Sequence, residues 1–131
     1  MTLATRYGLT GIGALALLSL VHWYRGSGLL PLPGGNYLLG VLPNFAAAIA
    51  ITFVLLSIWS DQHRGADYES TKRVFLVAAS ISGIGLTAWE FLQETSKRLI
   101  FDAHDLGATL VGIVAAGILF YVLTRGLRLE P

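Results

Sequence analysis

Four long apolar segments dominate this sequence and restrict it to folds that suit a membrane. They cover residues 7–24, 38–60, 74–93 and 106–123. Each is close to the ~20 residues that a helix needs to cross a hydrocarbon core about 30 Å thick. Inside lipid every backbone polar group must be paired within the protein, so spanning segments form either helices or closed barrels. The continuous apolar runs 49–56 and 113–123 lack the alternation of a barrel strand, which favours helices.

The composition agrees with a membrane location and excludes several classes of function. Charged residues make up 13% of the 131 residues, against roughly 25% in an average soluble chain. The formal net charge of +1 gives no clustered excess of cations for a nucleic-acid backbone. Because the chain has no Cys, a disulfide scaffold and a thiolate metal site are excluded. We therefore expect a single all-α domain, residues 1–131, folded as an antiparallel bundle of four transmembrane helices.

The flanks of the apolar segments predict the topology. The first segment ends in aromatic and basic residues, 22–25, which suit a helix end at the interface rather than a cleaved signal peptide. Four spans place both termini and the 61–73 loop on one side, with six Lys and Arg against three on the other side. The positive-inside rule then predicts cytoplasmic termini in a prokaryotic cytoplasmic membrane. The sequence leaves open the role of the loop 26–36.

Proline and small residues suggest how the second, third and fourth segments are built. Pro43 is expected in the first turn of the second helix, where its missing N–H has no partner to lose. Ala108, Gly112 and Ala116 form a row of small residues four apart in the fourth segment. Such rows let helix backbones approach closely. We interpret this row as a packing surface rather than a ligand site.

Polar residues gather between the third and fourth apolar segments. They include Glu90, Gln93, Glu94, Lys97, Arg98, Asp102, His104 and Asp105. On a helix, Glu90, Gln93 and Glu94 share one face. Lys97 and Arg98 follow Glu94 by about one helical turn, so Glu94 is expected to form an ordinary interfacial pair with one of them.

Glu90 lies in an apolar stretch and needs a specific environment. A carboxylate in hydrocarbon costs at least ~2.5–3.5 kcal/mol. Glu90 is therefore expected to face the bundle and to find a cation or donor there, or to take up a proton, unless it lies high enough to meet interfacial water. Asp102 and Asp105 also have a simple structural explanation, because Asp stabilises a helix N-terminus.

The same polar groups suit several kinds of chemistry. Carboxylates and the imidazole of His104 can hold a divalent cation or move a proton. Arg98 suits a phosphate or a carboxylate. No spacing typical of a zinc protease, a serine hydrolase or a phosphate-binding loop is present. We expect no cofactor, with a divalent cation left open, and the sequence does not decide whether the protein is an enzyme.

The pattern Glu90-x2-Gln93-x4-Arg98-x3-Asp102-x2-Asp105, followed by Gly112, resembles the VanZ-like family of small integral membrane proteins. Thr109 stands where that family typically has Asn, and the basic-and-His pattern that enters an earlier helix is not obvious here. The resemblance implies a cell-envelope protein linked to glycopeptide (teicoplanin) resistance. It makes the five polar residues of the pattern the candidate ligand-binding residues. It does not extend to His104 or Glu94.

Four functions follow from these features. The leading expectation is a polar site between the third and fourth helices that binds a lipid or glycan-precursor head group, or a cation bridging to one. Its partners would be membrane lipids and lipid-linked envelope precursors, not nucleic acid. The alternatives are a membrane-embedded enzyme with Asp102 or Asp105 as base, a small proton-coupled exporter with Glu90 as coupling acid, and a structural subunit. A homo-oligomer is compatible with each.

Overall fold

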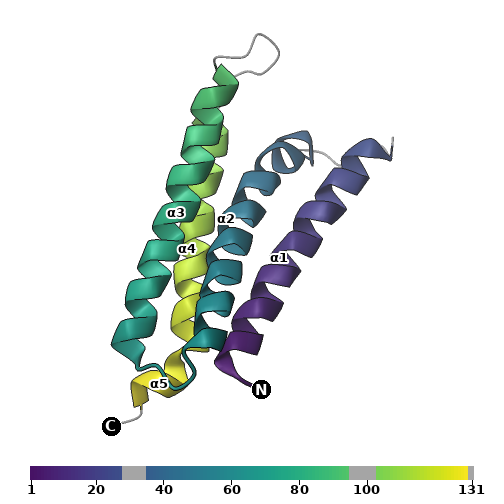
Figure 1. Cartoon of the computed structure of the whole chain (residues 1–131). Coiled ribbons are helices and arrows are strands. Elements are labelled where there is room, and N and C mark those ends of the chain that lie inside the picture. The colour runs from purple at the N-terminus through teal and green to yellow at the C-terminus, as the bar shows by residue number, and fades with distance from the viewer. Residues whose placement is uncertain (28–34, 95–102, 130–131) are drawn as a thin grey trace.

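The computed structural model is all-helical in the residues that it describes, 1–27, 35–94 and 103–129. Its helices are α1 (Leu3–Gly26), α2 (Gly35–Gln62), α3 (Tyr68–Glu94), α4 (Ala103–Leu123) and the short α5 (Arg125–Leu129) (Figure 1). The first four each contain a stretch long and apolar enough to cross a membrane. The predicted all-α class and its four apolar segments are therefore confirmed, and each segment lies inside one helix.

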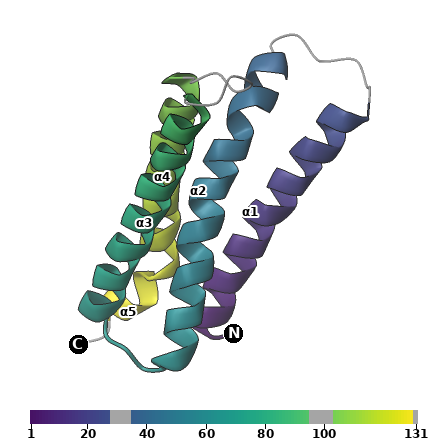
Figure 2. The same cartoon turned by 45° about the horizontal axis from the view of Figure 1, so that its top comes forward.

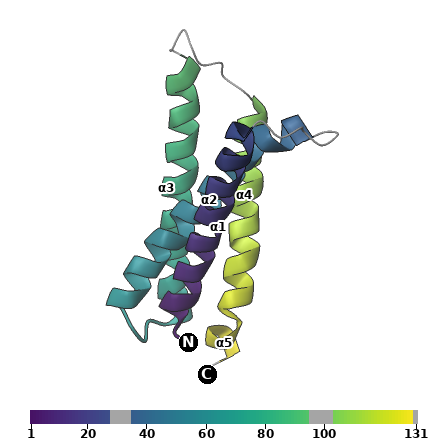
Figure 3. The same ribbon diagram turned by 90° about the vertical axis from the view of Figure 1, so that its right-hand side faces the viewer.

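α2 is the central helix of the molecule. It packs against α1, α3 and α4, and α3 also packs against α4. Figure 2 shows α2 between α1 and the α3–α4 pair. The N-terminus and α5 lie at one end of the molecule, close to the connection between α2 and α3 (Figure 1). At the opposite end α3 reaches beyond α4 (Figure 3).

Small residues bring α1 against α2. A Cβ atom added at Gly11 would lie 3.0 Å from Val54 Cγ2 and 3.2 Å from the Val54 backbone nitrogen. One turn away, Ser57 Oγ donates a hydrogen bond of 2.8 Å to the carbonyl oxygen of Ala4. Close backbone approach gives van der Waals packing, and the hydrogen bond joins the two helices. Lipid chains offer no equivalent of either interaction, so both stabilise the α1–α2 contact.

Gly112 brings α4 against α2 even more closely. A Cβ atom there would lie 2.7 Å from the Phe45 carbonyl oxygen and 2.8 Å from Ala48 Cβ. Ala116, one turn further along the predicted row, is fully buried. Gly112 and Ala116 therefore pack as the row predicts, whereas Ala108 is half-buried. On the third side of α2, Ser82 Oγ of α3 donates to the Ala48 carbonyl oxygen at 3.0 Å.

An aromatic cluster joins all four long helices. It consists of Tyr7, Phe53, Phe75 and Phe120, one residue from each helix, and all four are buried. Phe75 and Phe120 stack with ring centroids 4.3 Å apart, and Tyr7 lies 6.1 Å from Phe53. Aromatic pairs at such distances contribute about 0.5–1.5 kcal/mol beyond their buried area. The cluster fixes the helices in the half of the molecule that carries the termini.

The Tyr7 hydroxyl is a polar group within this apolar cluster. It is buried and has no hydrogen-bond partner in the part of the chain that the structure describes. A buried polar group without a partner costs about 1–3 kcal/mol. We expect Tyr7→Phe to raise the free energy of unfolding by about 1 kcal/mol, measured by denaturant titration in detergent. Tyr121→Phe is the contrasting variant, because the Tyr121 hydroxyl is exposed and interacts with Arg128, so its removal is expected to bring no gain in stability. A loss of stability with Tyr7→Phe would contradict the expectation.

The connection from α2 to α3 is polar and mixed in sign, as the sequence suggests. Arg64 and Asp61 form an ion pair of 2.8 Å that is largely exposed and so contributes little. Gly65 turns the chain with φ of +86°, a conformation that favours glycine. Asp67 then precedes α3 and accepts the Ser70 backbone N–H at 3.3 Å. The Ser70 hydroxyl, with this N–H, lowers the pKa of Asp67.

Candidate functional site: a buried carboxyl between α2 and α3

Glu90 lies on α3, about one turn before the helix ends at Glu94. Its side chain is only 2% exposed. Glu90 Oε1 accepts a hydrogen bond of 3.0 Å from Asn44 Nδ2 of α2. Glu90 Oε2 is buried and has no hydrogen-bond partner within the described ranges. This burial agrees with the expectation that Glu90 faces the protein interior, and it contradicts the alternative that interfacial water solvates the carboxyl.

The position of Asn44 depends on the first turns of α2. The helix begins at Gly35, so Pro43 lies inside it and not in its first turn. The expectation for Pro43 was wrong because the helix extends beyond the apolar run through Gly and Asn. A proline inside a helix removes one backbone hydrogen bond and bends the axis. Figure 3 shows the first turns of α2 directed away from the rest of the helix. Asn44 follows this bend and points its amide toward α3.

The structure describes the other predicted residues only in part. Gln93 lies in the last turn of α3, and its side chain is outside the described residues. Arg98 and Asp102 also lie outside the described residues. Asp105 lies in the first turn of α4, where helix N-terminal stabilisation places an acidic residue. Its backbone carbonyl oxygen accepts the Thr109 hydroxyl at 3.0 Å.

The described hydrogen-bond donor to Glu90 lies on α2. The sequence places the polar site between the third and fourth helices, whereas the described contact of Glu90 is with α2. No described contact joins Glu90 to Asp105. Thr109 is 2% exposed and uses its hydroxyl within α4. The α2–α3 contact arises because Asn44 and Glu90 face each other across neighbouring helices.

Asn44 is the functional candidate that the sequence does not single out. An amide inside an apolar span has few ways to satisfy its hydrogen bonds except across helices. This rule pairs Asn44 of the second segment with a polar residue of another span, and Glu90 is the strongest candidate. An Asn within an apolar segment is a signal that the sequence contains, but no local spacing links Asn44 to Glu90.

The described residues around Glu90 carry neither an ion-pair partner nor a metal-binding cluster. The described residues place no ion-pair partner beside its carboxyl, and the ion pair of Arg64 lies at the other end of α2. They also form no cluster of three or more His, Cys, Asp or Glu that could hold a metal ion. Asn44 and Glu90 together offer three oxygen atoms, fewer than the six to eight that Ca²⁺ takes. The pair is better suited to a hydrogen-bond donor than to a bare divalent cation.

Comparison with known proteins gave no match among family models, curated proteins or solved structures. The resemblance to the VanZ-like family therefore depends on the polar motif alone. The functional argument for this chain starts from its own geometry.

Proposed function

We propose that this protein is an integral membrane protein of the prokaryotic cell envelope that binds the polar head group of a lipid or lipid-linked glycan precursor. The observation that carries the proposal is the carboxyl of Glu90, buried in a helix of membrane-spanning length, for which the described residues supply a partner on only one oxygen. A buried acceptor without a partner costs about 1–3 kcal/mol, and more when it is charged. A ligand that brings a hydroxyl or an amine to Oε2 offsets this cost.

Asn44 is the member of the Asn44–Glu90 pair that a head group can contact directly. Its side chain is partly exposed, whereas Glu90 is buried. An amide carries two N–H donors and one acceptor oxygen, and the bond to Glu90 uses one donor. Glu90 therefore orients Asn44, which can offer its remaining groups to a ligand. The two residues act together as an orienting acid and a contacting amide.

The wider site follows from the topology and the family resemblance. We propose an antiparallel bundle with cytoplasmic termini. This topology places the end that carries Asn44 and Glu90 at the external face of the cytoplasmic membrane. Arg98 would contact an anionic group of the ligand, and Gln93 would add a hydrogen bond. Asp102 and Asp105 would orient Arg98 or hold a bridging cation. The resemblance to the VanZ-like family links such a site to teicoplanin resistance.

Head-group binding is tested with Glu90→Ala in purified protein. Native mass spectrometry in detergent, with phosphatidylglycerol, phosphatidylethanolamine and a polyprenyl-linked disaccharide as probes, should show that at least one of them binds the unaltered chain. Loss of one hydrogen bond predicts about tenfold weaker binding in the variant. Glu69→Ala is the matched control, because Glu69 lies exposed in the first turn of the same helix. Equal binding by the Glu90 and Glu69 variants would overturn the proposal.

The resistance role has its own test in cells. Expression of the unaltered chain in a teicoplanin-sensitive strain is expected to lower susceptibility, and Glu90→Ala is expected to abolish the effect. Chemical conversion of a bound lipid would instead identify an enzyme. The exporter alternative gains no support, because Glu90 lies near one end of α3 and not at its middle. If the Glu90 variant matches the unaltered chain in both lipid binding and susceptibility, the structural-subunit alternative is supported instead.

A further inference from the structure

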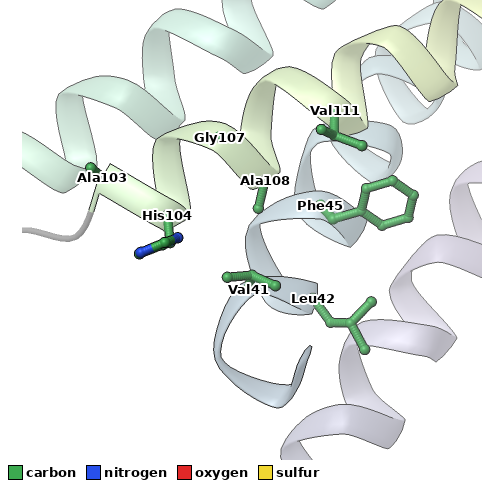
Figure 4. Close-up of a pocket in the computed structure, with 8 residues that line it drawn as sticks. All are labelled: Val41, Leu42, Phe45, Ala103, His104, Gly107, Ala108 and Val111. Carbon is green, nitrogen blue, oxygen red and sulfur yellow. The ribbon is translucent and has the colours of Figure 1, made fainter. Parts of the chain in front are cut away.

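A cleft with charged walls lies at the end of the molecule that carries α5. Its volume is about 640 Å³, within the roughly 300–1,000 Å³ range of ligand sites. The α2–α3 connection, the start of α3 and part of α5 line it, and they include Asp67, Tyr68, Glu69, Leu127 and Arg128. The groove between α2 and α4 is different, because its lining is apolar apart from His104 (Figure 4).

Two tyrosines hold the Arg128 guanidinium in position. Its central carbon, Cζ, lies 3.5 Å from the centroid of the Tyr121 ring and 5.9 Å from that of the Tyr68 ring. Arg128 Nη2 also donates a hydrogen bond of 2.9 Å to the Tyr121 carbonyl oxygen. Arg128 Nε is buried and has no hydrogen-bond partner in the described part of the chain. Because a guanidinium has five N–H donors, a group held in this way keeps donors for an anion that enters the cleft.

The α3 side of the cleft carries a carboxylate that is also held in place. Asp67 interacts with the hydroxyl and the backbone N–H of Ser70, which lower its pKa and keep it ionised at neutral pH. Glu69 adds negative charge, but no hydrogen bond or ion pair among the described residues holds its exposed side chain. Within the same ranges neither carboxylate forms an ion pair with Arg128. The cleft therefore presents opposite charges that helix capping and ring stacking keep apart.

The length of α4 places the cleft at the depth of lipid head groups. This helix has 21 residues, which at 1.5 Å per residue span about 30 Å, the thickness of the hydrocarbon core. Arg128 lies just beyond its last residue, Leu123, in the short α5. The head-group layer outside the core is roughly 5–8 Å thick. A fixed cation and a fixed anion at this depth match a head group that carries both charges.

We infer that this cleft binds a phosphoethanolamine group, with the phosphate at Arg128 and the ammonium at Asp67. A guanidinium binds phosphate through paired N–H groups, and a carboxylate accepts hydrogen bonds from an ammonium. Phosphatidylethanolamine carries this group at the depth of the cleft, whereas an anionic head group without an amine would bring negative charge toward Asp67. The cleft lies at the other end of α3 from Glu90, so the inference stands independently of the proposed function.

The phosphate contact is tested with Arg128→Gln. Delipidated protein in detergent is titrated with phosphatidylethanolamine, and bound lipid is counted by native mass spectrometry. We expect the variant to bind at least about tenfold more weakly, since it loses charge-assisted hydrogen bonds to the phosphate. Arg125→Gln is the matched control, because Arg125 is an exposed residue of the same short helix and does not line the cleft. Equal binding by the two variants would overturn the inference.

The ammonium contact is tested with Asp67→Asn, which keeps a helix-capping side chain and removes its charge. The unaltered chain is expected to bind phosphatidylethanolamine more tightly than phosphatidylglycerol with the same acyl chains, and the variant is expected to lose this preference. Glu69→Ala is the matched control and is expected to keep it, because Asp67 stays in place. The same preference in both variants would overturn the inference, as would its absence from the unaltered chain.

Two further measurements identify the source of the ligand and separate the two sites. Glycerophosphoethanolamine carries the same group without acyl chains, so binding as tight as that of the lipid would identify a soluble ligand. Binding of the lipid alone identifies the membrane as the source. Glu90→Ala is expected to keep the phosphatidylethanolamine that Arg128→Gln loses, and its loss from both variants would contradict a separate site. Thermal unfolding in the same detergent shows that each variant is folded.

Discussion

Gly112→Val is expected to lower the free energy of unfolding by about 3 kcal/mol. A single Cβ at this position already comes within 2.7 Å of the Phe45 carbonyl oxygen and 2.8 Å of Ala48 Cβ. The nearest of these atoms belongs to the α2 backbone, so no side-chain rotation relieves the clash. α4 must move away from α2, which loses the contacts that hold the two helices together. Denaturant titration in detergent micelles measures the change.

Gly117→Val is the control for this prediction. Both glycines lie in α4, and both substitutions add the same side chain, but a Cβ at Gly117 meets no atom within 4 Å. Valine is a better helix former than glycine by a few tenths of a kcal/mol. The control is therefore expected to be as stable as the unaltered chain or slightly more stable. Equal destabilisation by both substitutions would show that the cost lies in α4 itself rather than in its contact with α2.

The helices could be predicted from sequence because hydrocarbon imposes a simple rule on length and polarity. Their ends could not, because a helix continues wherever its backbone hydrogen bonds do. α3 begins at Tyr68, well before the apolar run at Val74, and carries Lys72 and Arg73 within its first turns. The charges end the hydrophobic segment, but they are good helix formers in water. α2 likewise begins before its apolar run, at Gly35, and this early start places Pro43 inside the helix.

Of the described contact between Glu90 and Asn44, only Glu90 could be predicted from the sequence. Glu90 stands out because a carboxyl in an apolar stretch is costly wherever the chain folds. Its partner is 46 residues away on another helix, and no local spacing encodes that contact. The motif-based reading favours α4 because the acidic pair Asp102 and Asp105 is close in sequence. The face of α3 that carries Glu90 also carries Ser82, whose hydroxyl donates to the Ala48 carbonyl oxygen of α2, so the contact is set by the packing of two whole helices.

The second large effect concerns the bond between Asn44 and Glu90. Asn44→Leu removes the donor at Glu90 Oε1, while Oε2 already has no described partner. A buried carboxyl without a partner costs several kcal/mol, so we expect this variant to lose about 2–3 kcal/mol of unfolding free energy. Glu90→Leu removes the carboxyl itself and leaves only the partly exposed amide. It is expected to be as stable as the unaltered chain or up to about 1 kcal/mol more stable.

The double variant Asn44→Leu/Glu90→Leu distinguishes an ordinary helix contact from a buried acid. Interhelical hydrogen bonds in membrane proteins average about 0.6 kcal/mol, so a contact of this kind would give a coupling energy near that value. If the loss in Asn44→Leu comes from an unpartnered carboxyl, removing the carboxyl as well restores stability, and the coupling reaches about 2–3 kcal/mol. A small coupling would place Glu90 among structural polar residues. A large coupling, with Glu90→Leu stable yet unable to bind a head group, identifies a side chain that costs stability and serves binding.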